Sequence, residues 1–143
     1  MKNDKVISYI QKALQKEPRI LACYIFGSYI KKVHNKESDI DLAVIVKNKK
    51  LITENTIYEL LKDVPFPKDL DLSIVDKASS PIFLFQVISS GTRIYTKDKN
   101  RADAFEAQVL RYYYDTQHIR NIYNYYLREK FPSKLYAHRQ RAD

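Results

Sequence analysis

Apolar residues follow two different spacings along this chain, one typical of amphipathic helices and one typical of strands. Residues 4–16 carry apolar side chains at helical intervals, whereas residues 20–26 form a nearly continuous apolar run that ends at Gly27. The same reasoning predicts further strands at 39–46, 69–75 and 92–96 and further helices at 54–63, 81–89 and 101–129. Strands that alternate with helices predict an α/β (α+β) domain with a mixed sheet flanked by helices.

The length of 143 residues is enough for one domain with a sizeable core. We therefore predict a single domain over 1–143, with a core at about 1–97 and a helical extension at about 98–143. An apolar stripe follows the predicted long helix at helical spacing: Phe105, Val109, Tyr112, Ile119, Tyr123 and Tyr126. Two interpretations of this stripe stay open: it packs on the protein's own sheet, or it binds a partner.

Composition narrows the class of protein only modestly. The net charge of +8 favours phosphate-bearing or acidic partners, but it does not distinguish nucleotides from nucleic acid or an acidic protein. The single cysteine, Cys23, rules out a disulfide framework and fits core packing inside the strand at 20–26. No apolar run reaches the roughly 20 residues that span a bilayer, so we expect a cytoplasmic protein without a membrane partner.

A pair of acidic residues stands at the start of the predicted strand 39–46. Asp39 and Asp41 are two residues apart and therefore project from one face, while Ile40 and Leu42 point the other way into the core. Two neighbouring carboxylates repel each other, and a divalent cation relieves that repulsion. Mg²⁺ suits such a site because it prefers oxygen ligands and fills its shell with water and substrate phosphates.

The predicted strand 69–75 repeats this pattern. Polar residues occupy one face and apolar residues the other: Asp69, Asp71 and Ser73 against Leu70, Leu72 and Ile74. If this strand neighbours the first, Asp69 or Asp71 completes a cluster of three carboxylates, as two-metal nucleotidyl transfer requires. Asp76, on the opposite face of a regular strand, is expected to cap a turn.

Gly27 and Ser28 lie where an apolar strand gives way to a predicted helical turn at 28–33. The glycine allows the backbone to approach a ligand closely, and the serine adds a hydroxyl group. The N–H groups that follow lie at the positive end of the helix, which favours a triphosphate.

The spacing of these motifs resembles the sequence signature of the DNA polymerase beta nucleotidyltransferase superfamily. Gly27-Ser28 is followed by ten residues and then by Asp39-Ile40-Asp41 on a strand. Four fixed positions at this spacing arise by chance with a probability on the order of 10⁻³.

More narrowly, the chain resembles a minimal nucleotidyltransferase (MNT), the antitoxin half of HEPN/MNT toxin–antitoxin pairs. Residues 70–78, then Pro81 and residues 91–95, are similar to the strand of the third carboxylate and the helix–strand unit after it. The resemblance covers residues 20–96 well and the C-terminal helix only loosely.

This resemblance implies a polymerase-beta-like nucleotidyltransferase fold and assigns roles to five residues. Gly27 and Ser28 would contact the nucleotide phosphates, Asp39 and Asp41 would bind the metals, and Asp71 would be the third ligand. It also implies two Mg²⁺ ions, ATP as the nucleotide donor, and transfer of AMP to a tyrosine of a cognate HEPN ribonuclease toxin. Two alternatives remain: an antitoxin that acts by binding alone, and a nucleotidyltransferase acting on a small molecule or an RNA end.

Overall fold

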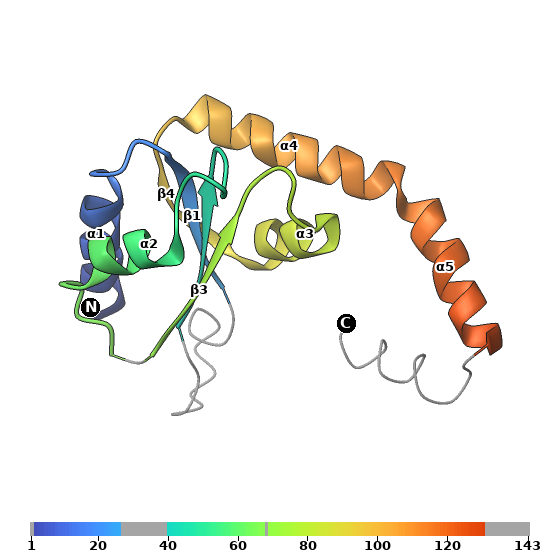
Figure 1. Cartoon of the computed structure of the whole chain (residues 1–143), viewed down its shortest axis with the longest axis horizontal. Helices are drawn as coiled ribbons and strands as arrows, with labels where there is room; N and C mark the ends of the chain where they lie inside the picture. The colour runs from blue at the N-terminus through green and yellow to red at the C-terminus, as the bar shows by residue number, and fades with distance from the viewer. Residues whose placement is uncertain (1, 27–39, 68, 131–143) are drawn as a thin grey trace. The chain divides into compact units, whose positions relative to one another are not determined.

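The computed structural model describes residues 2–26, 40–67 and 69–130, which form a four-stranded mixed sheet with helices on both faces (Figure 1). In chain order the elements are α1 (Lys2–Leu14), β1 (Ile20–Phe26), β2 (Ile40–Val46), α2 (Glu54–Leu61), β3 (Leu70–Val75), α3 (Pro81–Ser90), β4 (Thr92–Thr96), α4 (Lys99–Asp115) and α5 (Gln117–Lys130). The strand order is β3-β2-β1-β4, with β2 and β3 parallel and the other pairs antiparallel. The predicted mixed sheet is confirmed.

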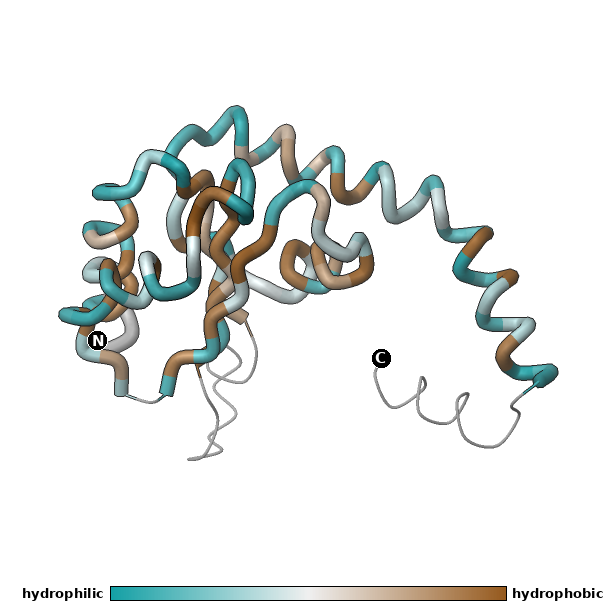
Figure 2. The backbone as a smooth tube through the Cα atoms, viewed as in Figure 1, coloured by the Kyte–Doolittle hydropathy of each residue, from teal (hydrophilic) through white to brown (hydrophobic). Residues whose placement is uncertain are grey.

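Each face of the sheet packs against its own pair of helices. Ile40, Leu42 and Val44 of β2 belong to a core that includes apolar residues of α1 and α2. Ala43 and Ile45 point to the opposite face and pack with apolar residues of α3 and α4. Figure 2 shows hydrophobic residues along the strands and along α3, and a mixture of hydrophobic and hydrophilic residues along α1 and α2. The period-two alternation of β2 therefore decides which side chains reach each helical layer.

Helix α3 begins and ends at residues that the sequence marks clearly. The Ser80 side chain accepts a hydrogen bond from the Phe83 N–H, and Pro81 occupies the first turn, where its missing N–H costs nothing. At the other end, a Cβ on Gly91 would collide with the Val87 carbonyl oxygen and would come within 3.4 Å of the Phe26 Cβ. Helix α3 therefore ends where an added side chain would collide with its own last turn and crowd β1.

A polar network fastens the first part of α4 to the sheet. The Tyr24 hydroxyl donates to Glu106, and the Arg93 guanidinium lies 3.2 Å from the same carboxylate and 3.0 Å from Asp103. Burial raises the pKa of the Tyr24 phenol, and its hydrogen bond to Glu106 raises it further. These interactions satisfy a hydroxyl that would otherwise be buried without a partner.

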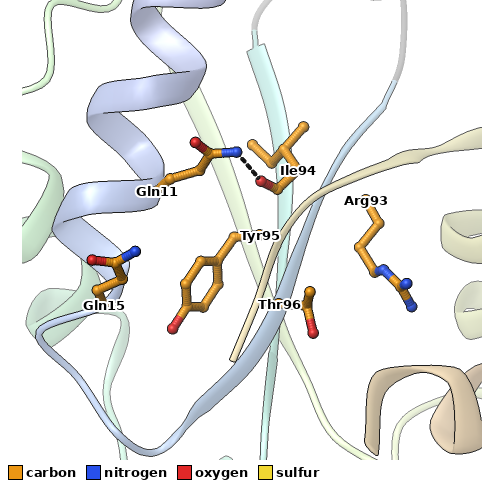
Figure 3. Close-up of a pocket in the computed structure, with 6 residues that line it drawn as sticks. All are labelled: Gln11, Gln15, Arg93, Ile94, Tyr95 and Thr96. Carbon is orange, nitrogen blue, oxygen red and sulfur yellow. Dashed lines mark hydrogen bonds between the residues drawn. The ribbon is translucent and has the colours of Figure 1, made fainter. Parts of the chain in front are cut away.

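The β4 edge of the sheet carries an irregularity that helix α1 covers. The register with β1 shifts between Cys23 and Tyr24, so Ile94 has no partner in the β1 ladder. The Gln11 side chain donates a 2.7 Å hydrogen bond to the Ile94 carbonyl oxygen (Figure 3). This side chain thus provides a donor for the carbonyl group of the bulged residue.

The predicted helix 101–129 is wrong in one respect, because it is interrupted at Thr116 and forms α4 and α5. The Thr116 hydroxyl donates to the Tyr112 carbonyl oxygen at 2.8 Å, and the Thr116 N–H donates to the same oxygen at 3.1 Å. Arg120 donates to the Thr116 hydroxyl at 2.6 Å and to the Tyr113 carbonyl oxygen. The apolar stripe did not reveal this break, since it records the spacing of apolar side chains and not the hydrogen bonds around a threonine.

The chain divides into two compact units, Met1–Val109 and Leu110–Asp143. In the first unit, α4 buries Ala102 and Val109. In the second, α5 buries none of its residues, and Ile119, Tyr123 and Tyr126 are more than half exposed. The prediction of one domain with a helical extension stays a prediction. None of the helices in the described residues is both long and apolar enough to cross a membrane.

Candidate active site

The structure places two of the predicted carboxylates opposite each other on neighbouring parallel strands. Asp41 of β2 is the register partner of Asp71 of β3. Residues paired in this way have Cα atoms about 4.8 Å apart and side chains on the same face of the sheet. The condition that strand 69–75 neighbours strand 39–46 is therefore met.

The other three predicted site residues, Gly27, Ser28 and Asp39, lie outside the described residues, as does the predicted turn at 28–33. Their roles stay predictions. The strands on either side of this segment are described: β1 ends at Phe26 and β2 begins at Ile40.

The register bears on the choice between Asp69 and Asp71. Asp71 pairs with Asp41 inside the ladder, whereas Asp69 precedes the first residue of β3. The main chain of Asp69 is engaged at the strand entry, where its carbonyl oxygen accepts a 2.8 Å hydrogen bond from the Ile40 N–H. Both side chains are exposed, so exposure does not distinguish them. The register favours Asp71 as the partner of Asp41 and assigns no role to Asp69.

An aromatic contact adjoins the acidic pair on the same face of the sheet. Phe26 is the register partner of Asp41 across β1 and β2. Its ring meets that of Phe83 in α3 edge-on, with centroids 6.3 Å apart. Asp41 is half-buried beside this contact, while Asp71 on the outer strand is exposed. The pair therefore has an apolar wall on one side and solvent on the other.

The donor chemistry of this pair fits a hard divalent cation. Asp41 and Asp71 offer carboxylate oxygens only, which are the ligands that Mg²⁺ prefers. Within residues 2–26, 40–67 and 69–130, no group of three histidine, cysteine or acidic residues is placed to hold a metal. A three-carboxylate site would therefore draw on a residue outside those ranges, and Asp39 is the predicted one.

Two further residues behave as the sequence predicts. Cys23 is fully buried in the core, and burial raises the pKa of its thiol. Asp76 is buried and caps a turn: its carboxylate accepts hydrogen bonds from the N–H groups of Lys49 at 3.0 Å and Ala78 at 2.9 Å. Burial alone would raise the pKa of Asp76, but these N–H donors outweigh it and hold the pKa below its ordinary value.

Sequence reasoning missed a cavity of about 370 Å³ along the outer side of β3. Its lining joins three stretches of the chain: Lys49 and Glu54; Leu72, Ser73, Ile74 and Val75; and Ser79, Ser80 and Phe83. No motif connects these stretches, since only the strand order brings them together.

The chain belongs to the nucleotidyltransferase family described as "Polymerase beta, Nucleotidyltransferase", which it matches over residues 8–100. That range contains the whole sheet and the paired carboxylates, so the resemblance to this superfamily is confirmed.

Among individual proteins, the chain is homologous to the protein adenylyltransferase MntA of Shewanella oneidensis. The two are 25% identical over 96 residues, which is 66% of this chain and 66% of MntA, just under two thirds of that relative's length.

Two solved structures share the fold. One is described as a toxin–antitoxin with AMP-PNP, and it is 24% identical with a TM-score of 0.65, covering 81% of this chain and 93% of that one. The other is a tri-AMPylated Shewanella oneidensis HEPN toxin in complex with MNT antitoxin. The matched chain of that structure is 23% identical to this chain with a TM-score of 0.63, and the match covers 85% of this chain and 94% of that one. The predicted polymerase-beta-like nucleotidyltransferase fold is confirmed.

Proposed function

We propose that this chain is an antitoxin that transfers AMP from ATP to a tyrosine hydroxyl of a HEPN toxin and so inactivates the toxin. The observation that carries the proposal is the pairing of Asp41 with Asp71 on neighbouring strands of a nucleotidyltransferase domain. Homology to a protein adenylyltransferase supports a protein acceptor over a small molecule or an RNA end. The AMPylated toxin in the related complex supports the HEPN class of partner.

Each predicted site residue has a distinct task in this proposal. Asp39, Asp41 and Asp71 would hold Mg²⁺, which when bound neutralises phosphate charge and lowers the pKa of a hydroxyl group. Gly27 and Ser28 would contact the triphosphate. Asp71 lies on the outer strand and is exposed, so it is well placed to face an acceptor that arrives from solution.

The reaction exchanges a phosphoanhydride bond of ATP for a phosphoester bond to tyrosine. The tyrosine oxygen attacks the α-phosphorus, the bond from that phosphorus to the bridging oxygen breaks, and pyrophosphate leaves. The hydroxyl proton passes to a carboxylate, for which Asp71 is the candidate, and then to solvent. Positioning the two oxygens in line and compensating the phosphate charge provide most of the rate enhancement.

The test is a transfer assay with a defined acceptor. The chain is incubated with Mg²⁺, ATP labelled at the α-phosphate, and the HEPN toxin encoded beside its own gene. We expect label on a toxin tyrosine, identified by mass spectrometry. Asp39→Asn and Asp41→Asn variants should bind the toxin but lose the label.

Two results would overturn the proposal. Toxin that is bound and neutralised without acquiring label would identify an antitoxin that acts by binding alone. Label that appears on a small molecule or an RNA end, and not on the toxin, would identify a different acceptor class.

A further inference from the structure

Strand β3 is an edge strand, and its outward main-chain groups can be identified from the register. Ile40 pairs with Leu70, and the Ile40 N–H donates to the Asp69 carbonyl oxygen. In a parallel ladder this pattern directs the main-chain groups of alternate residues toward the neighbouring strand. The N–H and C=O groups of Asp71, Ser73 and Val75 therefore point toward β2. The N–H and C=O groups of Leu72 and Ile74 face outward, where no described residue pairs with them.

The cavity of about 370 Å³ lies along this outward edge. Four consecutive β3 residues line it, so it follows the strand and does not end at a single side chain. One wall comes from the connection after β2, with Lys49 and Glu54, and the other comes from the start of α3, with Ser80 and Phe83. Its size is in the range of ordinary ligand sites.

Asp76 braces both walls of this cavity. Its carboxylate accepts the N–H of Lys49 at 3.0 Å, which fixes the first wall. On the second wall, its own N–H donates to the Ser79 hydroxyl oxygen at 3.0 Å, and the Ser79 N–H donates back to its carbonyl oxygen at 3.0 Å. A buried carboxylate with this many partners holds a groove that is formed before any ligand arrives.

We propose that this edge binds an extended segment of the acceptor protein as an added strand, which places the acceptor tyrosine beside Asp71. This inference rests on the proposed function and specifies how the acceptor is recognised. Main-chain pairing along an open edge is an established way for a domain to bind a polypeptide. A strand that covers Leu72 to Val75 is about 13 Å long and ends next to Asp71.

The chemistry of the groove favours a polypeptide over a nucleic acid. Leu72 and Ile74 present N–H donors and C=O acceptors at main-chain spacing, whereas a phosphate backbone offers acceptors only. Lys49 and Glu54 carry opposite charges, so this wall gives no net attraction for a polyanion. Because side chains of an added strand alternate, every second one would point to the face that carries Asp71.

Hydrogen exchange of individual amides tests this proposal directly. The Asp41→Asn variant, which should bind toxin without modifying it, is exchanged alone and with saturating HEPN toxin. We expect the Leu72 and Ile74 amides to exchange at least about tenfold more slowly in the complex. The Ser73 and Val75 amides already donate to β2, so they serve as internal controls and should change little.

A substitution provides a second readout. Proline at an edge position removes only an outward N–H and is tolerated there. Ile74→Pro should raise the KM for toxin about tenfold and leave the KM for ATP unchanged, because one hydrogen bond to the acceptor is lost. Ile74→Val keeps the N–H and trims the side chain, so it serves as the matched control.

The two proposals fail separately in these experiments. If wild-type chain labels the toxin but the Leu72 and Ile74 amides exchange at unchanged rates in the complex, the edge proposal is wrong and the proposed function stands. If these amides are protected but no label is transferred, the edge proposal stands and the proposed transferase activity is wrong. Absence of both protection and label overturns both proposals.

Discussion

At the β4 edge of the sheet, the carbonyl of the bulged Ile94 accepts a hydrogen bond from Gln11, and α1 packs nearby. At the β3 edge, the outward groups of Leu72 and Ile74 have no partner among the described residues, and a cavity follows them. Unpaired edges invite association with other chains, and proteins commonly cover or distort them. The covered edge lies away from the carboxylates, while the open edge is the strand that carries Asp71. The contrast suggests that the β3 edge is kept open for binding.

The largest effect should come from Asp71, the acidic residue of the open edge strand. Asp71→Asn should reduce AMP transfer at least about a hundredfold, because proton transfer and metal binding both depend on this carboxylate. Asp69→Asn is the matched control, since Asp69 is also exposed and lies two residues away. It should retain activity within a few-fold in the labelled-ATP assay. The reverse result would make Asp69 the third ligand.

Sequence reasoning could predict one part of this contrast but not the rest. The alternation in 69–75 predicted that Asp71 and Ser73 share a face, because a strand has a fixed period of two. That β3 lies at an edge depends on strand order, which no local pattern encodes. The bulge at Ile94 and the break at Thr116 were missed for a similar reason. At each site a side chain outside the local pattern donates a hydrogen bond: Gln11, 83 residues away in the sequence, to the Ile94 carbonyl oxygen, and Arg120 to the Thr116 hydroxyl.

The walls of the cavity along β3 should depend on the carboxylate of Asp76. Asp76→Ala removes the acceptor of two N–H groups in a buried site and should lower the free energy of unfolding by about 3 kcal/mol. Asp76→Asn keeps the size and one acceptor oxygen and should cost less. Urea unfolding measures both variants. A loss under 0.5 kcal/mol for the alanine variant would show that the turn does not depend on this side chain.

Low pH should weaken the same cavity walls, because it protonates Asp76. The pKa of Asp76 is held below its ordinary value in the folded protein, so the carboxylate stabilises the fold at pH values above the unfolded pKa. That stabilisation is lost as the pH falls below about 4 toward the lowered pKa. In wild-type protein the Lys49 and Ala78 amides should therefore lose protection on acidification. Gln11 at the covered edge is neutral, so its hydrogen bond to Ile94 should not respond directly to the same titration.

On the β4 side, the attachment of α4 should depend on Arg93. Arg93→Met leaves Glu106 and Asp103 without their shared cation in a partly buried setting and should lower the free energy of unfolding by about 2 kcal/mol. Arg101→Met is the control, because its 4.0 Å ion pair with Asp98 is largely exposed and should contribute less than about 0.5 kcal/mol. Equal effects of the two variants in urea unfolding would mean that the network around Arg93 adds nothing beyond a surface ion pair.

The smallest effect should come from removing the cover of the β4 edge. Gln11→Leu keeps the bulk of the side chain but leaves the Ile94 carbonyl without its donor, which should cost about 1 kcal/mol. Gln15→Leu is the matched control, because Gln15 and Gln11 line a cavity of about 280 Å³ at the β4 edge, and Gln15 is exposed (Figure 3). A covered edge cannot pair with a strand of another molecule, so the Gln11→Leu variant should also self-associate more readily, as sedimentation velocity can measure. If both variants unfold alike and self-associate to the same extent, the hydrogen bond from Gln11 is incidental. The difference between the two edges would then rest on the bulge and α1 alone.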